Sequence, residues 1–458
     1  MNNEQVPDGA EASGCEVVVL VPHPTSAEML VCHPPVGEHG GRDGLPSVVL
    51  GPEPDTSDIV RAVGDLLGSP VTLLRANTMS WHDNFDSASM VVEVEPITSA
   101  VPEPFHWQHV EPSDVKGVSP RWAAESVGAW LVERTSGWSP LRPQWSRPGW
   151  LSQASSWMKH QMLLAGYEHP EEPQIHWIWG VSVVLSAGSA SGTAYLKCSG
   201  DRFVTEPVVT RTLAQHSPTL LPQVFAIDAD RGWMLMRDMR GTPLGEQPPA
   251  GWGEGLVALQ RLQQQWLGRT QELIDLGAEE RSLATLTQWV ERTTDDTSLM
   301  SRLASGQRRA WSRSVPAMIE ACRQLDTGGP GPTLVHGDFH PWNVFTTQGG
   351  VRVFDWTDAS VSHPFVDLVT YIGRSDDVEV RQKLVRLYLT RWDSQVNSAA
   401  LTDLTRIALV VGSLHQAHTY SQLIPTVMPD DVGHLRDGDV GWLARAMRFA
   451  DDGLDAQY

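Results

Sequence analysis

A short polar segment between apolar runs constrains this chain more than any other feature of its sequence. It follows a strand-like apolar run and reads His-Gly-Asp-Phe-His-Pro-Trp-Asn over residues 336–343. Apolar residues over 343–345 and 351–354 then flank four turn-forming residues at 347–350, and Asp355 follows. This pattern predicts a loop at the end of a buried strand and a β-hairpin that returns Asp355 to that loop.

The order His-Gly-Asp, His, Asn and a later strand-flanked Asp resembles the aminoglycoside phosphotransferase family, which shares the protein-kinase-like fold. Five positions specified within eight residues are too many for a polar loop that arose by chance. The resemblance covers residues 160–458, and its strongest motifs lie within 334–356. It implies a bilobal kinase-like fold and an ATP- and Mg²⁺-dependent transfer of a phosphoryl group to an alcohol.

The residue types in this segment suit phosphoryl transfer, in which the protein supplies position and charge neutralisation. Asp338 is expected to orient and deprotonate the acceptor hydroxyl. Asn343 and Asp355 carry the oxygen ligands that Mg²⁺ prefers, and the hairpin brings them together. By the family resemblance, His336 and His340 brace the loop and are not the base.

A kinase-like catalytic loop implies a nucleotide-binding lobe upstream, and the sequence offers one. Lys197 ends a predicted strand and Glu206 opens a predicted helix, which suits a phosphate-binding lysine and its ion-pair partner. A lone lysine after a strand would otherwise be a surface charge. The Ser/Gly-rich turn before this strand is predicted to approach phosphate through Gly188 and Gly192, and Met236 is predicted to face the adenine.

Residues 15–110 alternate short apolar runs with turn signals, except for one segment with helical spacing over 57–67. Ser57 or Asp58 is the expected N-cap and Gly68 the stop. Strands, a helix and further strands in this order resemble the Nudix hydrolase fold, whose metal-binding box lies on that helix. Arg61 and Gly68 match the ends of the box, but its paired glutamates are missing, so hydrolysis by this domain is disfavoured. The predicted strands are 16–21, 28–32, 46–50, 71–76 and 89–94.

These patterns predict an α+β protein with a bilobal kinase-like part and an extra N-terminal α+β Nudix-like domain. The intervening segment is rich in Trp, Pro, Arg and Ser, and is predicted to be a connector pinned to a folded surface, with a helix over 149–164. One strand is predicted over 175–185. The predicted divisions are a disordered terminus (1–14), a non-catalytic Nudix-like domain (15–115), the connector and helix (116–160), a kinase-like N-lobe (161–240) and a helical C-lobe with the catalytic loop (241–458).

The net charge of −21 is concentrated near the N-terminus, where residues 1–115 hold 18 Asp and Glu against three Arg. A nucleic-acid partner requires a basic face, so such a partner is disfavoured. No run of about 18 uncharged apolar residues is present, which argues against a membrane span. The first residues do not resemble a secretory signal, so a cytoplasmic location is expected.

The acceptor is expected to be a small molecule. Only eight residues separate Asp355 from Pro364, too few for the activation loop and peptide platform of a protein kinase. Acidic residues in the last third of the chain would suit a cationic acceptor such as an amino sugar or an aminoglycoside, although a solvated acidic surface explains them equally well.

Three residues on an apolar helix predicted over 407–424 form the candidate acceptor site: His415, His418 and Tyr420. Polar groups on one turn of a buried helix can line a sugar pocket. A histidine that only packs in a core is the commoner case.

A second interpretation is a scaffold protein whose kinase-like part does not turn over and whose acidic N-terminal module docks a partner. The complete set of Lys197, Glu206, Asp338, Asn343 and Asp355 argues against it, because an inactive kinase commonly lacks at least one of them.

Overall fold

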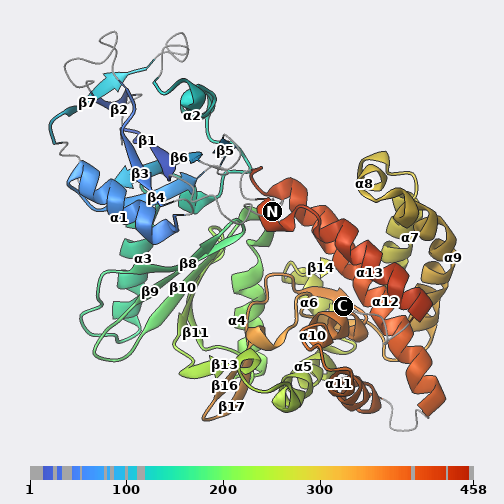
Figure 1. Ribbon diagram of the computed structural model, residues 1–458. Coiled ribbons are helices and arrows are strands. Elements are labelled where there is room, and N and C mark those ends of the chain that lie inside the picture. Colours follow the sequence, from blue (N-terminus) through green and yellow to red (C-terminus); the bar gives the residue numbers. More distant parts are fainter. Residues whose placement is uncertain are drawn as a thin grey trace. The chain divides into compact units, whose positions relative to one another are not determined.

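The structure is a computed structural model in which the described residues form two compact units (Figure 1). Unit 1 comprises Met1–Trp157 with Val427–Gly433, and unit 2 comprises Met158–Thr426 with His434–Tyr458. The terminus predicted to be disordered lies outside the described residues except for Gly14. The structure describes residues 14–23, 28–32, 44–51, 54–76, 80–82, 87–97, 102–110, 119–392, 398–429 and 432–452.

Unit 1 contains a mixed sheet of order β3-β1-β6-β4, with β5 also paired to β6, and a separate β2-β7 ribbon. Its elements are β1 (Cys15–Leu20), β2 (Glu28–Cys32), β3 (Ser47–Leu50), α1 (Thr56–Leu67), β4 (Val71–Ala76), β5 (Ser80–His82), β6 (Ser87–Pro96), β7 (Phe105–His109) and α2 (Ala124–Ser136). Because successive strand residues face opposite sides, β1 contributes to two cores. Val17 and Val19 pack in the core that includes α1, and Val18 and Leu20 in the core that includes α2.

Helix α1 confirms the helix predicted over 57–67, but its N-cap differs from the prediction. The Asp55 carboxylate accepts the backbone N–H of Asp58 at 2.8 Å, so the cap precedes the first helical residue, Thr56. Gly68 ends the helix in the left-handed conformation, at φ +62°. The likeness to a Nudix domain stays a prediction.

Helix α2 lies within the segment predicted as connector, and this is a correction. Val127, Trp130 and Leu131 are buried against β1 and its neighbours. The sequence pattern concealed this helix because its apolar residues include a consecutive run over 129–132 and do not follow one face, and Val132 of that run is exposed. The predicted helix over 149–164 is present as α3 (Trp150–Leu164).

Four charged side chains form a buried cluster in unit 1. The Arg142 guanidinium lies 2.9 Å from Glu93 and 2.6 Å from Glu133. Arg75 lies 3.5 Å from each of the same two glutamates. The Arg142 side chain is fully buried, and we call these four residues the unit 1 ionic cluster.

The N-terminal part of unit 2 contains an antiparallel sheet of order β11-β12-β10-β9-β8. Its elements are β8 (Gln174–Trp179), β9 (Ser182–Ala187), β10 (Ala194–Ser199), α4 (Glu206–His216), β11 (Val224–Asp228) and β12 (Trp233–Arg237). The single strand predicted over 175–185 is wrong, because Gly180 and Val181 form a turn between two paired strands. The near-continuous apolar run concealed this turn.

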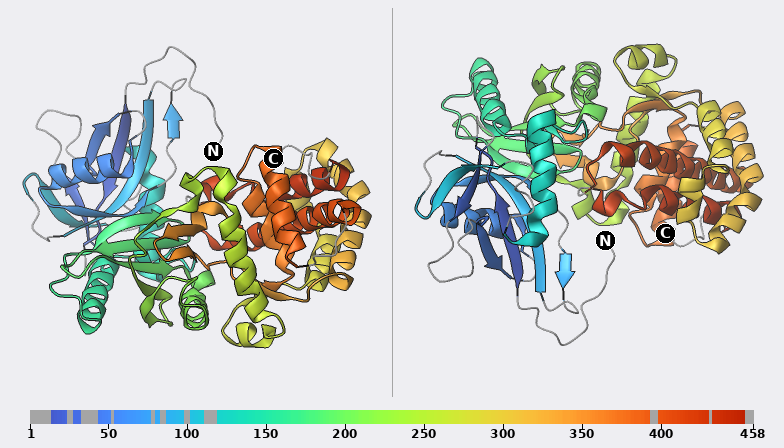
Figure 2. Two further views of the ribbon diagram at one scale, coloured as in Figure 1. Left: turned by 90° about the horizontal axis from the view of Figure 1, so that it is seen from below. Right: turned by 90° about the horizontal axis from the view of Figure 1, so that it is seen from above.

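The rest of unit 2 is predominantly helical, as predicted. Its elements are β13 (Gly241–Pro243), α5 (Gly253–Trp266), α6 (Thr270–Asp275), β14 (Glu279–Glu280), α7 (Leu283–Thr293), α8 (Thr297–Arg302), α9 (Ser305–Thr327), β15 (Thr333–Val335), β16 (Val344–Thr347), β17 (Gly350–Val353), β18 (Ser360–Ser362), α10 (Leu368–Ile372), α11 (Val378–Thr390), α12 (Ser398–Leu423) and α13 (Gly438–Asp452). Helices α12 and α13 run side by side and pack against α9, as the yellow-to-red part of Figure 2 shows.

Helix α12 lies within the large core of unit 2, where Ala408, Val411 and Leu414 are buried. Within the described part of the chain, none of the helices combines the length and the apolar character needed to cross a membrane.

Candidate active site

The polar loop after β15 is fixed by hydrogen bonds to its first two residues. The buried Asp367 carboxylate accepts the backbone N–H groups of His336 at 3.0 Å and Gly337 at 2.9 Å. Gly337 adopts φ +88°, and an added Cβ there would lie 2.4 Å from the Asp358 carbonyl oxygen. Only glycine therefore fits this position. The Gln416 side chain donates a hydrogen bond to the Gly337 carbonyl.

His336 lies in the position expected for a bracing residue. Its Nε2 donates to the Phe354 carbonyl at 2.9 Å, which ties the loop to the end of β17. Burial lowers the pKa of His336 to about 4, so the imidazole is neutral near pH 7. A fully buried neutral histidine cannot reach an acceptor hydroxyl, which agrees with its exclusion as the base.

Asp338 presents an ionised carboxylate at the surface of the loop. Its side chain is 48% exposed, and the Nε2 atom of His340 lies 3.5 Å from its Oδ2. Partial burial works to raise the pKa of Asp338, but His340 and His336 lower it more, so the pKa lies below its ordinary value. Asp338 is thus suited to accept a proton through its position and not through a raised pKa.

The predicted hairpin is confirmed, and its base holds the two predicted metal ligands. Strands β16 and β17 are antiparallel. Their pairing runs from Val344 opposite Val353 to Thr347 opposite Gly350, next to the turn. The backbone N–H of Phe354 donates to the Asn343 carbonyl at 3.1 Å, next to Asp355. The Asn343 Nδ2 donates to the Asp338 carbonyl at 3.0 Å, so the loop and the hairpin base form one structure.

Lys197 joins strand β10 of the antiparallel sheet to the hairpin. Its Nζ lies 2.7 Å from Glu206 Oε1 and 2.7 Å from Asp355 Oδ1. Burial works to lower the pKa of Lys197, but Asp355 and Glu206 raise it above its ordinary value. Glu206 is held in place by the Ser199 hydroxyl, which donates at 2.5 Å. The predicted pair of Lys197 and Glu206 is therefore formed.

Asp355 combines an unusual backbone with a strongly stabilised charge. It is one of three residues other than glycine with a positive φ in the described chain, at +65°. Burial opposes its charge, but Lys197 and a hydrogen bond from Thr357 hold its pKa well below the ordinary value. Both donors bind Oδ1, which leaves Oδ2 for a further partner.

The oxygen atoms at the hairpin base fit a divalent cation. Since the Asn343 Nδ2 is engaged by the Asp338 carbonyl, its Oδ1 is the atom left for a ligand. This amide oxygen and the Asp355 Oδ2 are hard donors of the kind that Mg²⁺ binds.

Sequence analysis did not identify Asp358, which adds to the negative charge here. Burial, Asp338 and Asp355 raise its pKa to about 6, against the effect of Arg281. We call Lys197, Glu206, Asp338, Asp355 and Asp358 the active-site cluster.

Gly188 and Gly192 lie in the turn at one end of β9 and β10. Their turn joins β9 to β10 at Ala187–Ala194, three residues along the strand from Lys197 and about 10 Å away. The turn between β8 and β9 lies at the other end of these strands, where the Gly200 N–H donates to the Val181 carbonyl. Lys197 pairs with Val184, which is three residues from Val181 in one turn and three residues from Ala187 at the other, so Lys197 lies midway between the two turns. The assignment of Gly188 and Gly192 to phosphate stays a prediction.

Met236 shares a face of the sheet with Lys197, as its predicted role requires. Lys197 pairs with Met234 and Tyr195 pairs with Met236, and directly opposed residues of antiparallel strands lie on the same face. Tyr195 therefore also lies on this face and was missed. Its spacing of two from Lys197 on a strand was the available signal.

The candidate acceptor residues separate into two groups. His415 is 1% exposed and has no hydrogen-bond partner for its ring among the described residues. His418 is 8% exposed and packs on the Trp289 ring at 5.1 Å. Both belong to the core. Tyr420 lies closer to the site, since burial together with Asp338 and Asp358 raises its pKa to about 12.

Comparison with known families identifies the class of this site. Residues 206–399 match the model of the APH family, described as the phosphotransferase enzyme family. This segment, less than half of the chain, is similar to the phosphotransferase enzyme family. It holds the whole active-site cluster except Lys197, and the chain is therefore a phosphotransferase, the enzyme class predicted from the sequence.

Solved structures of low sequence identity are similar to part of this chain. A choline/ethanolamine kinase family protein from Mesorhizobium loti is 18% identical over 66% of this chain and 95% of its own, with a TM-score of 0.45. A macrolide 2'-phosphotransferase from Brachybacterium faecium is 15% identical over 66% and 98%, with a TM-score of 0.43. A choline kinase from Streptococcus pneumoniae is 13% identical over 65% and 99%, with a TM-score of 0.43. No sequence among curated proteins matches this chain.

Proposed function

We propose that this protein is an ATP- and Mg²⁺-dependent kinase that phosphorylates a hydroxyl of a small polar molecule, such as an amino sugar or an aminoglycoside-like compound. The observation that carries the proposal is the contact of Lys197 with both Glu206 and Asp355 beside the loop of Asp338. These groups come from three separate parts of the chain, and each has the charge that a phosphoryl-transfer site needs.

The chain's own residues have distinct roles in this proposal. Lys197 would bind the α- and β-phosphates, with Tyr195 and Met236 next to the adenine on the same face of the sheet. Asn343 and Asp355 would hold Mg²⁺, which neutralises charge on the phosphates. Asp338 would orient the acceptor hydroxyl and take its proton, since its carboxylate is ionised and half exposed.

The short connection after Asp355 supports a small acceptor. Of the eight residues before Pro364, Ser360–Ser362 form β18, which pairs with β15 in front of the catalytic loop. This segment is committed to the core sheet and cannot form a peptide platform. The surplus of carboxylates around Asp338 and Asp358 supports an acceptor that carries ammonium groups.

The decisive test is the rate of phosphoryl transfer by the Asp338→Ala variant. We expect steady ATP-dependent phosphorylation to fall at least a hundredfold, because positioning and proton transfer are lost together. Asp295→Ala, which removes an exposed aspartate in the same unit, is the matched control and should retain the rate. A rate for Asp338→Ala within tenfold of the wild type would remove this mechanism.

The acceptor class is tested by a panel of aminoglycosides, amino sugars, neutral sugars and choline with ATP and Mg²⁺. We expect the largest kcat/KM for an acceptor with both a hydroxyl and an ammonium group. Preference for a neutral sugar would contradict the proposed charge recognition while leaving the kinase assignment intact.

A further inference from the structure

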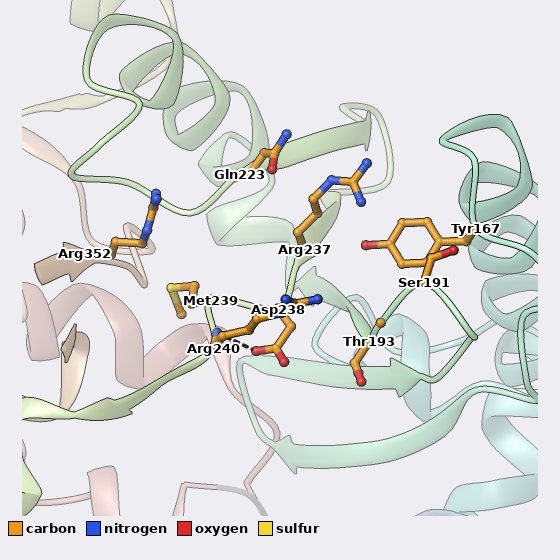
Figure 3. Close-up of a pocket in the computed structure, with 10 residues that line it drawn as sticks. Tyr167, Ser191, Thr193, Gln223, Arg237, Asp238, Met239, Arg240 and Arg352 are labelled. Carbon is orange, nitrogen blue, oxygen red and sulfur yellow. Dashed lines mark hydrogen bonds between the residues drawn. The ribbon is translucent and has the colours of Figure 1, made fainter. Parts of the chain in front are cut away.

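A cavity of about 240 Å³ lies beside the end of β12, and Figure 3 shows the residues that line it. Arg237 lines it, whereas its neighbour Met236 shares the face of Lys197, and adjacent strand residues point to opposite faces. The proposed nucleotide site does not use this cavity. Its walls come from the β9–β10 turn, the segment after β12, and β17, all within unit 2.

The lining of this cavity is rich in positive charge although the chain carries a net charge of −21. Arg237, Arg240 and Arg352 line it, and among the described residues none of the three has a carboxylate within ion-pair distance. The one acidic residue of the lining is Asp238, whose carboxylate accepts the backbone N–H of Arg240 at 2.9 Å. Guanidinium groups without carboxylate partners keep N–H donors that can bind an anion.

Two of these arginines are held in place before any ligand binds. The Arg237 guanidinium lies over the rings of Tyr167 at 5.0 Å and Phe225 at 5.5 Å. Arg352 donates from one nitrogen to the Pro218 carbonyl at 3.0 Å, which leaves its other N–H groups for a ligand. Preorganised donors lose less entropy when an anion binds.

The Ser/Gly-rich turn that sequence analysis assigned to phosphate completes this cavity. Ser191, Gly192 and Thr193 line it. Gly192 has φ +120°, and a Cβ at this position would lie 3.2 Å from the Arg240 guanidinium. Glycine thus lets this guanidinium lie close to the turn. The Tyr167 hydroxyl, which points toward Arg237 in Figure 3, and the exposed Gln223 amide provide neutral donors.

We propose that this cavity is a second ligand site, which binds a phosphate-bearing small molecule through Arg237, Arg240 and Arg352. Guanidinium groups match the geometry of phosphate oxygens, and hydroxyl and amide donors are the usual companions of such contacts. The volume exceeds that of orthophosphate and suits pyrophosphate or a small phosphomonoester. Arg352 lies on β17 and Ser191 lies in the β9–β10 turn. A bound phosphate would therefore connect the hairpin of β16 and β17 to the antiparallel sheet.

The test is calorimetric titration of the full-length chain with inorganic pyrophosphate in the absence of divalent cations. We expect one saturable site and about tenfold weaker binding in Arg240→Gln, since a charge-assisted contact is lost. Arg240 is exposed, so this variant should fold normally. Arg237→Gln should weaken binding by a similar or larger factor.

Two control variants locate the binding. Arg386→Gln removes one exposed positive charge from α11 and should change the affinity less than twofold. Lys197→Met removes the lysine of the proposed nucleotide site and should also leave the affinity within twofold. The proposal is overturned if Lys197→Met weakens binding more than Arg240→Gln does, if Arg386→Gln has the same effect as Arg240→Gln, or if no saturable binding occurs. None of these outcomes depends on turnover, so the proposed kinase activity is tested separately.

Discussion

The two units each contain a cluster of charged side chains, and the two clusters differ in their exposure and in their balance of charge. The unit 1 ionic cluster pairs two arginines with two glutamates, and its Arg142 side chain is fully buried. The active-site cluster has one lysine against four carboxylates, of which Asp338 is 48% and Asp355 39% exposed. The unit 1 ionic cluster is balanced and has no net charge to offer a ligand, and we call it the closed cluster. The active-site cluster is unbalanced and leaves negative charge for a cation or a cationic substrate, and we call it the open cluster.

The largest expected effect concerns the closed cluster. Arg142→Met would leave Glu93 and Glu133 short of a partner and should lower the free energy of unfolding by about 3–5 kcal/mol. Urea denaturation followed by tryptophan fluorescence measures this change. The rate of phosphoryl transfer per folded molecule should not change. The control is Arg61→Met, which breaks an exposed pair with Asp58 and should cost less than about 1 kcal/mol. Equal costs for the two variants would show that the cluster is not structural.

The open cluster should respond in activity instead. Asp355→Asn removes the negative charge from the proposed metal ligand and should lower kcat by about a hundred- to a thousandfold, with little change in folding as judged by circular dichroism. Asp228→Asn breaks the Asp228–Arg231 pair in the same unit and should leave kcat within twofold. A kcat for Asp355→Asn above a tenth of the wild-type value would contradict the distinction between the clusters.

The crowding of carboxylates in the open cluster should be visible in the pH dependence of stability. Burial, Asp338 and Asp355 raise the pKa of Asp358 to about 6. The folded state therefore retains a proton that the unfolded state releases near pH 4, so this stabilisation is present below that pH and is lost as the pH rises to about 6. The loss should amount to at most about 3 kcal/mol. Urea denaturation of the wild type and Asp358→Asn at pH 4 and pH 7 measures it. A difference between the two proteins that does not change with pH would contradict the raised pKa.

The smallest expected effect is stabilisation by the cation itself. ADP with Mg²⁺ at ten times its Kd should raise the free energy of unfolding by about 1.4 kcal/mol, because it binds only the folded state. Thermal denaturation with and without EDTA measures this shift. In the Asp355→Asn variant, the shift in denaturation temperature should be the same with and without EDTA. In the Arg142→Met variant, the part of the shift that depends on Mg²⁺ should remain. An equal shift in EDTA would argue against a metal at the hairpin base.

Sequence reasoning identified those parts of the site whose geometry is local. The loop from His336 to Asn343 is directly followed by the hairpin that ends at Asp355. Because a hairpin closes over a few residues, the spacing in the sequence was enough to place Asn343 next to Asp355. The ion pair of Lys197 with Glu206 was predicted from the order of the elements, because a strand that ends near Lys197 is followed by a helix that begins at Glu206.

The sequence did not predict those features that depend on contacts between distant parts of the chain. The turn between β8 and β9 was missed because the pairing of these two strands is not evident from an apolar run. The burial of His415 depends on packing across the large core of unit 2, which periodicity does not reveal. Asp358 acquires its raised pKa from its burial and from the carboxylates of Asp338 and Asp355, all of which depend on the folded chain.

The hairpin also indicates where the molecule can be modified. Asn343 and Asp355 lie at its base, whereas Gln348 and Gly349 form an exposed tip at the far end of β16 and β17. Residues inserted at that tip would extend into solvent and leave the spacing of the ligands unchanged. The tip is therefore a natural attachment point for a fluorescent reporter or an affinity handle on a working enzyme.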